Sequence, residues 1–277
     1  KWNGDFDFSK AKSEGVKFAI LRGAYACEKD VRFESYYKAC KSLSLPVGVY
    51  HYSMAKDVAE ARAEANFLIQ NVLKGKQFEY PIYMDVEDNT QKALGKDKLT
   101  EIVTAYCDTL EKAGYYVGIY SSGSFFGTYM NESKLERFDK WVAHWSKQCS
   151  YKGNYGMWQF GGETNVIRSN KVAGVVCDQN YAFVDYPKII KDKGLNGYGK
   201  TVAEPSVKPD KSLAEIANEV ITGKFGNGSE RRQKLTAMGY NYDEVQAEVN
   251  RILDAENSVY YTVQKGDCLQ YIANKYG

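Results

Sequence analysis

The chain has 277 residues, of which 26% are charged and 44% hydrophobic, a composition that predicts an ordinary globular protein with one large domain and something smaller. The formal net charge of +2 argues against a dedicated nucleic-acid binder, and no run of 18 apolar residues is present to span a membrane. The 23 tyrosines stand out, because a tyrosine ring with its hydroxyl suits contact with sugar faces, although we expect most of them to be ordinary surface residues.

Residues 1 to about 200 alternate strand-like and helical patterns. Helical spacing of apolar residues is clearest at 57–73 and 97–113, and Gly114 is a helix-end signal. Repeated strand–helix units predict a parallel sheet, so we expect an α/β fold with a TIM-like (β/α) barrel over 1–200. An eighth strand would then precede Lys1, and we expect it to be missing from this sequence. The seven strand-like runs are 17–22, 46–52, 80–86, 116–120, 140–145, 156–160 and 174–177.

The C-terminal third has a different pattern. Residues 201–211 contain two prolines and no apolar period, which predicts a linker between two nearly independent parts. Residues 212–255 carry apolar positions for three short helices separated by glycines, so we expect a small three-helix module. A further segment begins at 260–277.

The cysteines and histidines suggest neither a disulfide framework nor a metal site. Six cysteines occur without a C-x-x-C pair, which fits folding in a reducing compartment, and the first residues do not form a signal peptide. His51 and His144 lack ligand spacing and are each more simply read as hydrogen-bonded core histidines, so we expect no metal and no cofactor.

Acidic and aromatic residues gather where the expected strands end. Asp85 and Glu87 follow an apolar run and, being two residues apart, project to the same face of a strand. Glycoside hydrolysis needs such a pair, one carboxyl to donate a proton and one to stabilise positive charge, but two solvated acids leading into a turn fit the pair equally well. Barrel active sites lie at the carboxyl ends of the strands, so the whole set predicts a sugar-binding cleft, whereas aromatic rings that merely cap the core are the alternative. The expected substrate-binding residues are Arg22, Tyr50, Tyr52, Tyr83, Tyr120, Trp145, Trp158 and Gln159.

Residues 1–190 resemble the lysozymes of glycoside hydrolase family 25. Each motif is weak alone, but their order and spacing across the first domain are specific to that family. The motifs are KWNGDFDF (1–8), FAILR (18–22), GVYHY (48–52), PIYMDVE (81–87), GIYS (118–121), WVAHW (141–145), MWQF (157–160) and DQNYAF (178–183).

The resemblance implies cleavage of the β-1,4 bond between N-acetylmuramic acid and N-acetylglucosamine. It implies that Glu87 is the proton donor and that Asp178 is a late active-site acid. It also implies that Asp85 orients the acetamido group of the substrate, or stabilises an oxazolinium ion if that group is the internal nucleophile. The family usually opens with an Asp-bearing strand ahead of the position of Lys1, and this sequence starts after it.

The tail resembles two wall-binding modules. Residues 212–253 are similar to the choline-independent cell-wall-binding repeat of some phage lysozymes. Arg231 or Arg232 is the candidate contact to an anionic muropeptide, and arginines that merely solvate a helix face are an equal alternative. Residues 261–277 resemble the first half of a lysin motif, which binds N-acetylglucosamine chains.

These observations favour a monomeric N-acetylmuramidase whose partner is bacterial peptidoglycan, without nucleic acid or membrane as partner. It would act at the cell wall, released from a host cytoplasm as a phage endolysin or secreted as an autolysin; the cysteine content favours the endolysin. Two alternatives stay open: a chitinase-like hexosaminidase, and a catalytically dead peptidoglycan-binding protein. The three retained acids argue against the dead protein, and the tail favours peptidoglycan over chitin.

Overall fold

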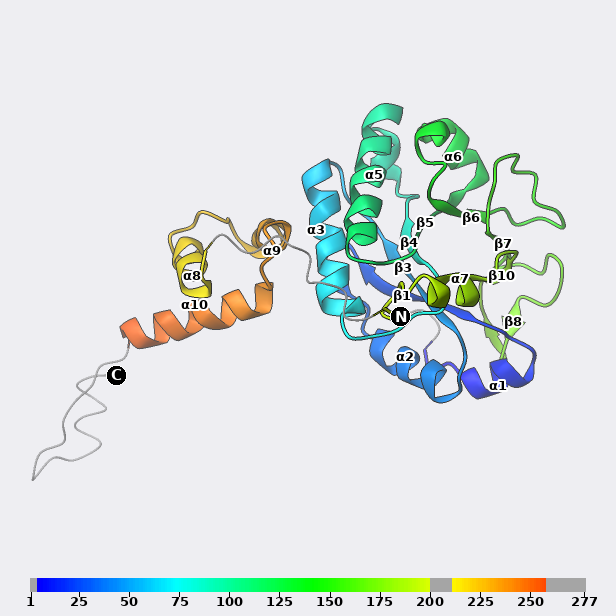
Figure 1. Cartoon of the computed structure of the whole chain (residues 1–277), viewed down its shortest axis with the longest axis horizontal. Coiled ribbons are helices and arrows are strands. Elements are labelled where there is room, and N and C mark those ends of the chain that lie inside the picture. Colours follow the sequence, from blue (N-terminus) through cyan, green and yellow to red (C-terminus); the bar gives the residue numbers. More distant parts are fainter. Residues whose placement is uncertain (1–3, 200–210, 258–277) are drawn as a thin grey trace, which may run out of the picture.

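The computed structural model describes residues 4–199 and 211–257, so nearly all of the expected linker and the lysin-like segment at 260–277 lie outside the described residues. A curled sheet with helices on its outer side forms the larger part, and three further helices form the smaller one (Figure 1). None of the helices within the described ranges is both long and apolar enough to cross a bilayer.

The sheet has eight strands in the order β10-β7-β6-β5-β4-β3-β1-β2. Its six central strands are parallel, while β10 pairs antiparallel with β7 and β2 pairs antiparallel with β1. The described residues therefore form a half-barrel with two antiparallel edges, and not the closed barrel that we expected. The strands are β1 (Ala19–Tyr25), β2 (Glu28–Lys29), β3 (Val47–Tyr52), β4 (Ile82–Asp85), β5 (Val117–Ser122), β6 (Asp139–Ala143), β7 (Met157–Gly161) and β10 (Gln179–Ala182).

Six of the seven expected strands are confirmed in the main sheet. The seventh, at 174–177, does form a strand, but its expected place in the barrel is wrong. There, β9 (Val175–Val176) pairs with β8 (Lys171–Val172) in a separate hairpin. The turn residues Ala173 and Gly174 have φ of 52° and 84°, the positive values that a tight two-residue hairpin turn requires. The chain then returns to the sheet as β10, which needs no crossover helix because it runs antiparallel.

The two clearest helical patterns are confirmed as α3 (Val58–Leu68), which continues into a π-helical turn η1 (Ile69–Leu73), and α5 (Lys96–Lys112). The carboxylate of Asp57 caps α3 by accepting from the amide of Glu60, and Gly114 follows α5 with φ of 84°. These helices pack their apolar sides on the outer face of the sheet to form the main core. The remaining helices of this part are α1 (Phe8–Ser13), α2 (Phe33–Ser42), α4 (Asn89–Lys92), α6 (Gly123–Tyr129), the 3₁₀ turn η2 (Glu132–Lys134) and α7 (Tyr186–Asp192).

The amino ends of the strands are closed by α7 and the turn after it. Asn196 is fully buried there: its Oδ1 accepts from the amide of Tyr116 at 2.7 Å and its Nδ2 donates to the carbonyl of Tyr80 at 2.9 Å. A second core surrounds Tyr83 and Tyr186, both of which donate to the buried carboxyl of Asp139. Because the amino ends of the strands are covered, a binding site on the sheet is expected at the carboxyl ends.

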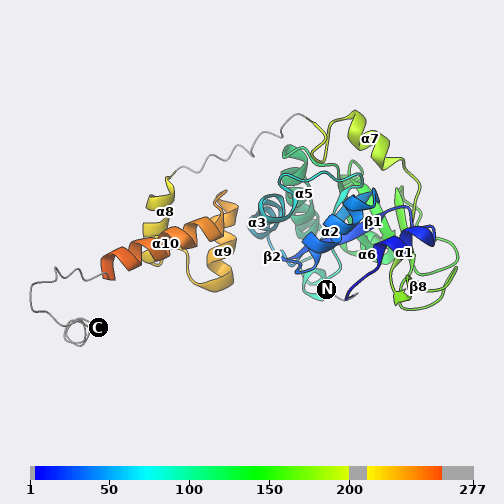
Figure 2. The same cartoon turned by 90° about the horizontal axis from the view of Figure 1, so that it is seen from below.

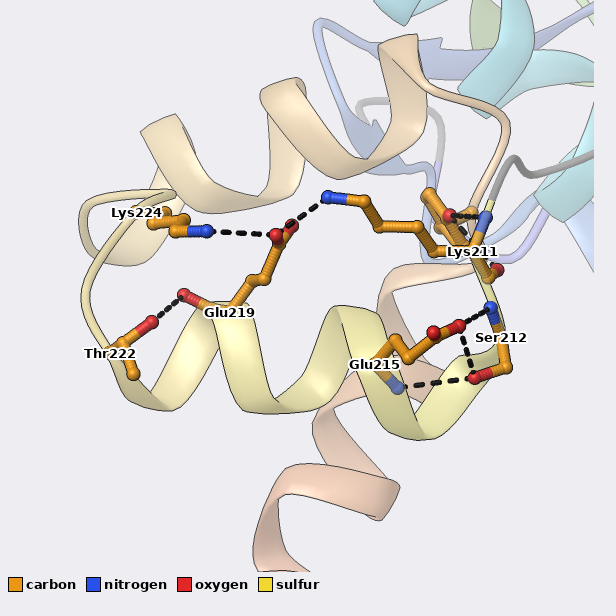
Figure 3. Close-up of polar contacts among 7 residues, drawn as sticks. Lys211, Ser212, Glu215, Glu219, Thr222 and Lys224 are labelled. Carbon is orange, nitrogen blue, oxygen red and sulfur yellow. Dashed lines mark hydrogen bonds and ion pairs between the residues drawn. The ribbon is translucent and has the colours of Figure 1, made fainter.

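The smaller part consists of α8 (Leu213–Ile221), α9 (Gly228–Ala237) and α10 (Tyr242–Asn257) around a separate apolar core. Ser212 and Glu215 form a capping box at the start of α8 (Figure 3). The carboxylate of Glu219 lies between the ammonium groups of Lys211 and Lys224, at 2.6 and 2.8 Å. These polar contacts join the start of α8 to the loop after it.

Helix α9 lies directly beside α3 in both views (Figures 1 and 2). The guanidinium of Arg232 stacks 4.1 Å from the ring centroid of Tyr242 in its own part and 6.0 Å from that of Phe67 on α3. The two parts are therefore in contact in this structure, which the linker composition did not predict.

Candidate active site

Asp85 and Glu87 lie at the carboxyl end of β4, as the strand pattern predicted. Asp85 is only 4% exposed on the inner face of the sheet, whereas Glu87 is open to the cleft above it. Burial raises the pKa of Asp85 well above its usual value, the negative charge of Glu87 raises it further, and the charge of Arg22 opposes both. Two acids with raised pKa values thus stand side by side at one strand end.

Oδ1 of Asp85 is buried and has no hydrogen-bond partner among the described residues. The nearby cation does not supply one, because Arg22 donates from Nε at 2.7 Å and pairs from Nη2 at 2.6 Å with Asp30 instead. Although burial works against it, hydrogen bonds from the Arg32 amide and from Arg22 hold the pKa of Asp30 below its usual value. The orphaned oxygen of Asp85 is an acceptor that lacks a donor, a costly arrangement unless a ligand satisfies it.

Asp178 completes a group of three acids around Tyr120. Partial desolvation by the surrounding protein raises the pKa of Glu87, and the negative charges of Asp178 and Asp88 raise it further. The Glu87 side chain is nevertheless open to the cleft. Burial also raises the pKa of Asp178, helped by the charge of Glu163. Burial raises the pKa of Tyr120, and the negative charges of Asp85, Glu87 and Asp178 raise it further. The phenol of Tyr120 therefore lies close to all three acids.

A cleft of about 830 Å³ extends from Glu87 and Tyr120 past Trp145. Gln159 organises its floor, because Oε1 accepts from the Tyr120 hydroxyl at 3.1 Å and from Nε1 of Trp145 at 2.9 Å. Trp145 is nevertheless 43% exposed, so its ring is held in place and still open to a ligand. These three side chains were expected to bind substrate, and the structure brings them together.

Arg22, Tyr50 and Tyr52 also surround the acids. Burial raises the pKa of Tyr50, and the next contribution comes from the charge of Asp85, so the two lie near each other. The hydroxyl of Tyr52 donates to Asp88 at 3.1 Å, just beyond the acid pair.

Two expected substrate contacts, Tyr83 and Trp158, are not brought to the cleft. Tyr83 shares the inner face with Asp85, but it lies two residues deeper and is fully buried in the lower core. Trp158 precedes the cleft residue Gln159 on β7, so strand alternation turns it to the outer face. There it donates from Nε1 to the carbonyl of His144 at 2.8 Å.

The two histidines differ. His51 is a fully buried core histidine between the Tyr106 hydroxyl and the Ala26 carbonyl, as expected. His144 lines the cleft, and its Nδ1 accepts from the amide of Ser150 at 3.0 Å.

The far wall of the cleft was not foreseen from the sequence. Glu132, Tyr151 and Lys152 line it, and the Tyr151 hydroxyl donates to Glu132. Glu132 begins η2 between β5 and β6, and Tyr151 and Lys152 belong to the loop between β6 and β7, so none of them carries a strand-end signal. In the portion of the chain that the structure describes, no three His, Cys, Asp or Glu side chains are grouped to hold a metal ion.

Known proteins resemble this chain in both parts. The phage Cp-7 lysozyme of Streptococcus is 28% identical over 228 residues, which cover 79% of this chain and 60% of that lysozyme. The modular autolysin LytC from Streptococcus pneumoniae, solved with a synthetic peptidoglycan ligand, is 26% identical with a TM-score of 0.55, over 64% of this chain and 43% of that chain. The chain thus spans about three fifths or less of the length of these two proteins.

Two smaller proteins share the fold. The bacterial lysozyme from Streptomyces coelicolor is 20% identical with a TM-score of 0.56, over 72% of this chain and 94% of that chain. The CTP1L endolysin is 17% identical with a TM-score of 0.57, over 90% and 96%. Residues 214–253 match the family described as CW_7 repeat, and residues 1–168, more than half of the chain, match Glycosyl hydrolases family 25. The chain therefore belongs to glycosyl hydrolase family 25.

Proposed function

We propose that this protein hydrolyses bacterial peptidoglycan at the β-1,4 bond between N-acetylmuramic acid and N-acetylglucosamine, and that it acts at the cell wall. Glu87 is the general acid in this proposal, because it is open to the cleft and its pKa is raised from the usual value. A carboxyl that keeps its proton near working pH can deliver it to the departing glycosidic oxygen.

Asp85 has the complementary role of orienting the acetamido group of the substrate. Its buried Oδ1 lacks a donor, and an acetamido N–H is a donor that the substrate carries. The observation that carries the proposal is this orphaned oxygen beside a solvent-open acid on the same strand end.

The two carboxyls would hold one proton between them. The negative charge of Glu87 already raises the pKa of Asp85, so the two acids do not both ionise easily, and the proton moves to whichever acid is less stabilised as an anion. An N–H bond to Asp85 stabilises the Asp85 carboxylate, with help from the charge of Arg22, and leaves the proton on Glu87. Substrate binding would thereby keep Glu87 protonated and ready to donate. Asp178 supplies further negative charge, which stabilises the positive charge that develops on the sugar.

Substitution of the two acids tests this assignment. Glu87→Gln should keep its fold and lose at least about 100-fold in turnover, the usual worth of general acid catalysis. Asp85→Asn should also lose activity, while Glu136→Gln, an exposed acid away from the cleft, is the matched control. Loss of turbidity of purified peptidoglycan reports activity, and near-normal lysis by the folded Glu87→Gln protein would rule out the acid assignment.

Mass spectrometry of the new reducing ends separates the alternatives. Muramic acid ends support the proposed bond, and glucosamine ends or cleavage of chitin support a chitinase-like hexosaminidase. A folded wild-type protein that cleaves neither polymer is the catalytically dead protein.

The smaller part is proposed to hold the enzyme at the wall, with Arg231 or Arg232 as the anionic-ligand contact. Arg231 donates to the Gly226 carbonyl, to Asn227 and to Gln246, at 3.0, 2.9 and 3.2 Å, and so also holds the glycine loop. Arg232 stacks on Tyr242 and faces Phe67. Arg232 therefore contacts both parts, so the melting temperature of an Arg232 variant must be measured together with its binding.

A further inference from the structure

Two tyrosine rings stack at the rim of the sheet, on the opposite side of the acids from Trp145. The ring centroids of Tyr25 and Tyr52 are 5.3 Å apart and their planes differ by 19°. The two residues are register partners on β1 and β3, and Tyr52 is the register partner of Asp85 on β4. Tyr25, Tyr52 and Asp85 therefore form one row at the carboxyl ends of three neighbouring strands.

The Tyr25 ring is exposed but its backbone is fixed from within the fold. Ala26, the next residue, has φ of 45°, a left-handed conformation that a non-glycine residue holds only when its surroundings impose it. Its amide donates to the Tyr52 carbonyl at 2.9 Å, and its carbonyl accepts from Nε2 of His51 at 2.7 Å.

The buried His51 supports this turn with an uncharged ring. A carbonyl can only accept, so Nε2 carries the hydrogen and Nδ1 accepts from the Tyr106 hydroxyl at 2.7 Å. Burial lowers the pKa of His51 to about 4, which keeps the ring neutral with this one arrangement of its hydrogen. The turn that presents Tyr25 is therefore held by a side chain that does not change charge.

Tyr52 is fixed from the side. Its hydroxyl donates to Oδ2 of Asp88, while Oδ1 of Asp88 caps α4 by accepting from the amide and hydroxyl of Thr90 at 2.8 and 2.7 Å. The Tyr25 ring consequently rests on a second ring whose hydroxyl is bonded to Asp88, and Tyr25 is 43% exposed.

The acids lie between two exposed aromatic surfaces. Counting across the sheet, Tyr25 is on the second strand to one side of β4, and Trp145 follows the second strand to the other side. Flat, rigid rings suit the apolar faces of sugars. We propose that the Tyr25–Tyr52 stack is a sugar-binding subsite for a hexosamine unit of the glycan strand, at the far end from Trp145. This inference rests on the proposed function and extends it to a further contact with the bound glycan.

Steady-state kinetics on soluble, peptide-free peptidoglycan glycan strands of graded length tests the subsite. Tyr25→Ala should raise KM about tenfold for long strands, the cost of removing one well-placed aromatic contact, with kcat within about twofold. The shortest cleavable strands, which do not reach the rim, should be unaffected, and Tyr25→Phe should restore the wild-type KM. Phe183→Ala is the matched control, because Phe183 is 60% exposed just after β10 and lies outside the cleft.

The outcomes are separable. An active, folded Tyr25→Ala protein whose KM for long strands equals that of the Phe183→Ala control overturns the subsite and leaves the proposed function standing. A rise in KM that is the same for every strand length also overturns it, because a subsite at the end of the bound glycan cannot act on short strands. A folded wild-type protein that cleaves no strand overturns the proposed function and the subsite with it.

Discussion

The backbone of Gly162 lies directly against the carboxylate of Asp178. A Cβ built on Gly162 would stand 2.2 Å from Oδ1 of Asp178 and 2.7 Å from the ring of Trp145. Only glycine leaves room for both cleft side chains in their present positions.

Gly162→Ala should therefore displace Asp178 and Trp145 without unfolding the protein, since both are exposed enough to move. A misplacement of about 1 Å costs up to roughly 100-fold in rate, so turnover of peptidoglycan should fall toward that value with little change in melting temperature. Gly127→Ala is the control, because its Cβ would meet nothing closer than 3.6 Å. Equal activity of the two alanine variants would show that Asp178 is not held in a required position.

The pH profile should respond to the charge of Asp178. A general acid works only while protonated, so activity should fall as pH rises through the raised pKa of Glu87. Asp178→Asn removes a negative charge that raises this pKa, and the alkaline limb should therefore move to lower pH, whatever happens to the maximal rate. Glu136→Gln, which makes the same charge change at an exposed site away from the cleft, should leave the limb in place. An alkaline limb unmoved by Asp178→Asn would mean that Glu87 does not control it.

Glu64 should make stability depend on pH. It is 2% exposed on α3, accepts from the Ser53 hydroxyl at 2.6 Å and the Met54 amide at 2.9 Å, and burial raises its pKa to about 7. Because the folded pKa lies above the unfolded one, its stabilising contribution is complete below about pH 4.5 and is lost as pH rises through about 7. The shift corresponds to a loss of about 3 kcal/mol.

Glu64→Gln should remove this loss, because a neutral amide can still bond both partners. The difference in melting temperature between variant and wild type should therefore grow in favour of the variant from pH 5 to pH 8. Taking that difference cancels the opposite contribution of His51, which both proteins share. Glu101→Gln, at an exposed position on α5, is the control. A difference that stays constant with pH would mean that Glu64 titrates normally.

Removal of residues 201–277 should weaken binding to whole cells and leave turnover of small soluble muropeptides nearly unchanged, because the tail supplies local concentration at the wall. The deletion also removes the packing of α9 on α3, so the melting temperature of the shortened protein must be measured alongside. A large loss of turnover in a protein that is still folded would show that the contact with α3 supports the chemistry.

Within the smaller part, Arg232→Ala should reduce pull-down on insoluble peptidoglycan if its guanidinium meets a muropeptide carboxylate. The double replacement of Arg231 and Arg232 should reduce it further, in part because Arg231 holds the glycine loop. Arg251→Ala is the control, since Arg251 pairs with Glu248 one turn away on the exposed side of α10. Unchanged pull-down in both arginine variants would leave the smaller part as a spacer.

The sequence alone determined the local elements and the acid pair. Apolar periodicity located α3, α5 and the six parallel strands, because burying one face of an element requires that spacing. Two-residue spacing after an apolar run predicted that Asp85 and Glu87 lie together, but β4 itself ends at Asp85, so the position of Glu87 depends on the loop that follows. The same alternation along β7 predicts that Trp158 points away from the cleft, because its neighbour Gln159 points into it. Trp158 was expected to bind substrate because it is aromatic, and strand alternation was not applied to it.

Only the tertiary structure decided what depends on contacts between distant segments. The antiparallel return of β10 follows from the hairpin before it, and the depth of Tyr83 follows from the sealing of the lower end by α7. Arg22 pairs with Asp30 and not with Asp85, so Oδ1 of Asp85 is left without a donor. Which partner a side chain takes in the folded protein cannot be read from the periodicity of the sequence. The stacking of Tyr25 on Tyr52 and the support from His51 likewise arise from register between strands, which is settled by packing of the whole sheet and not by any local run of residues.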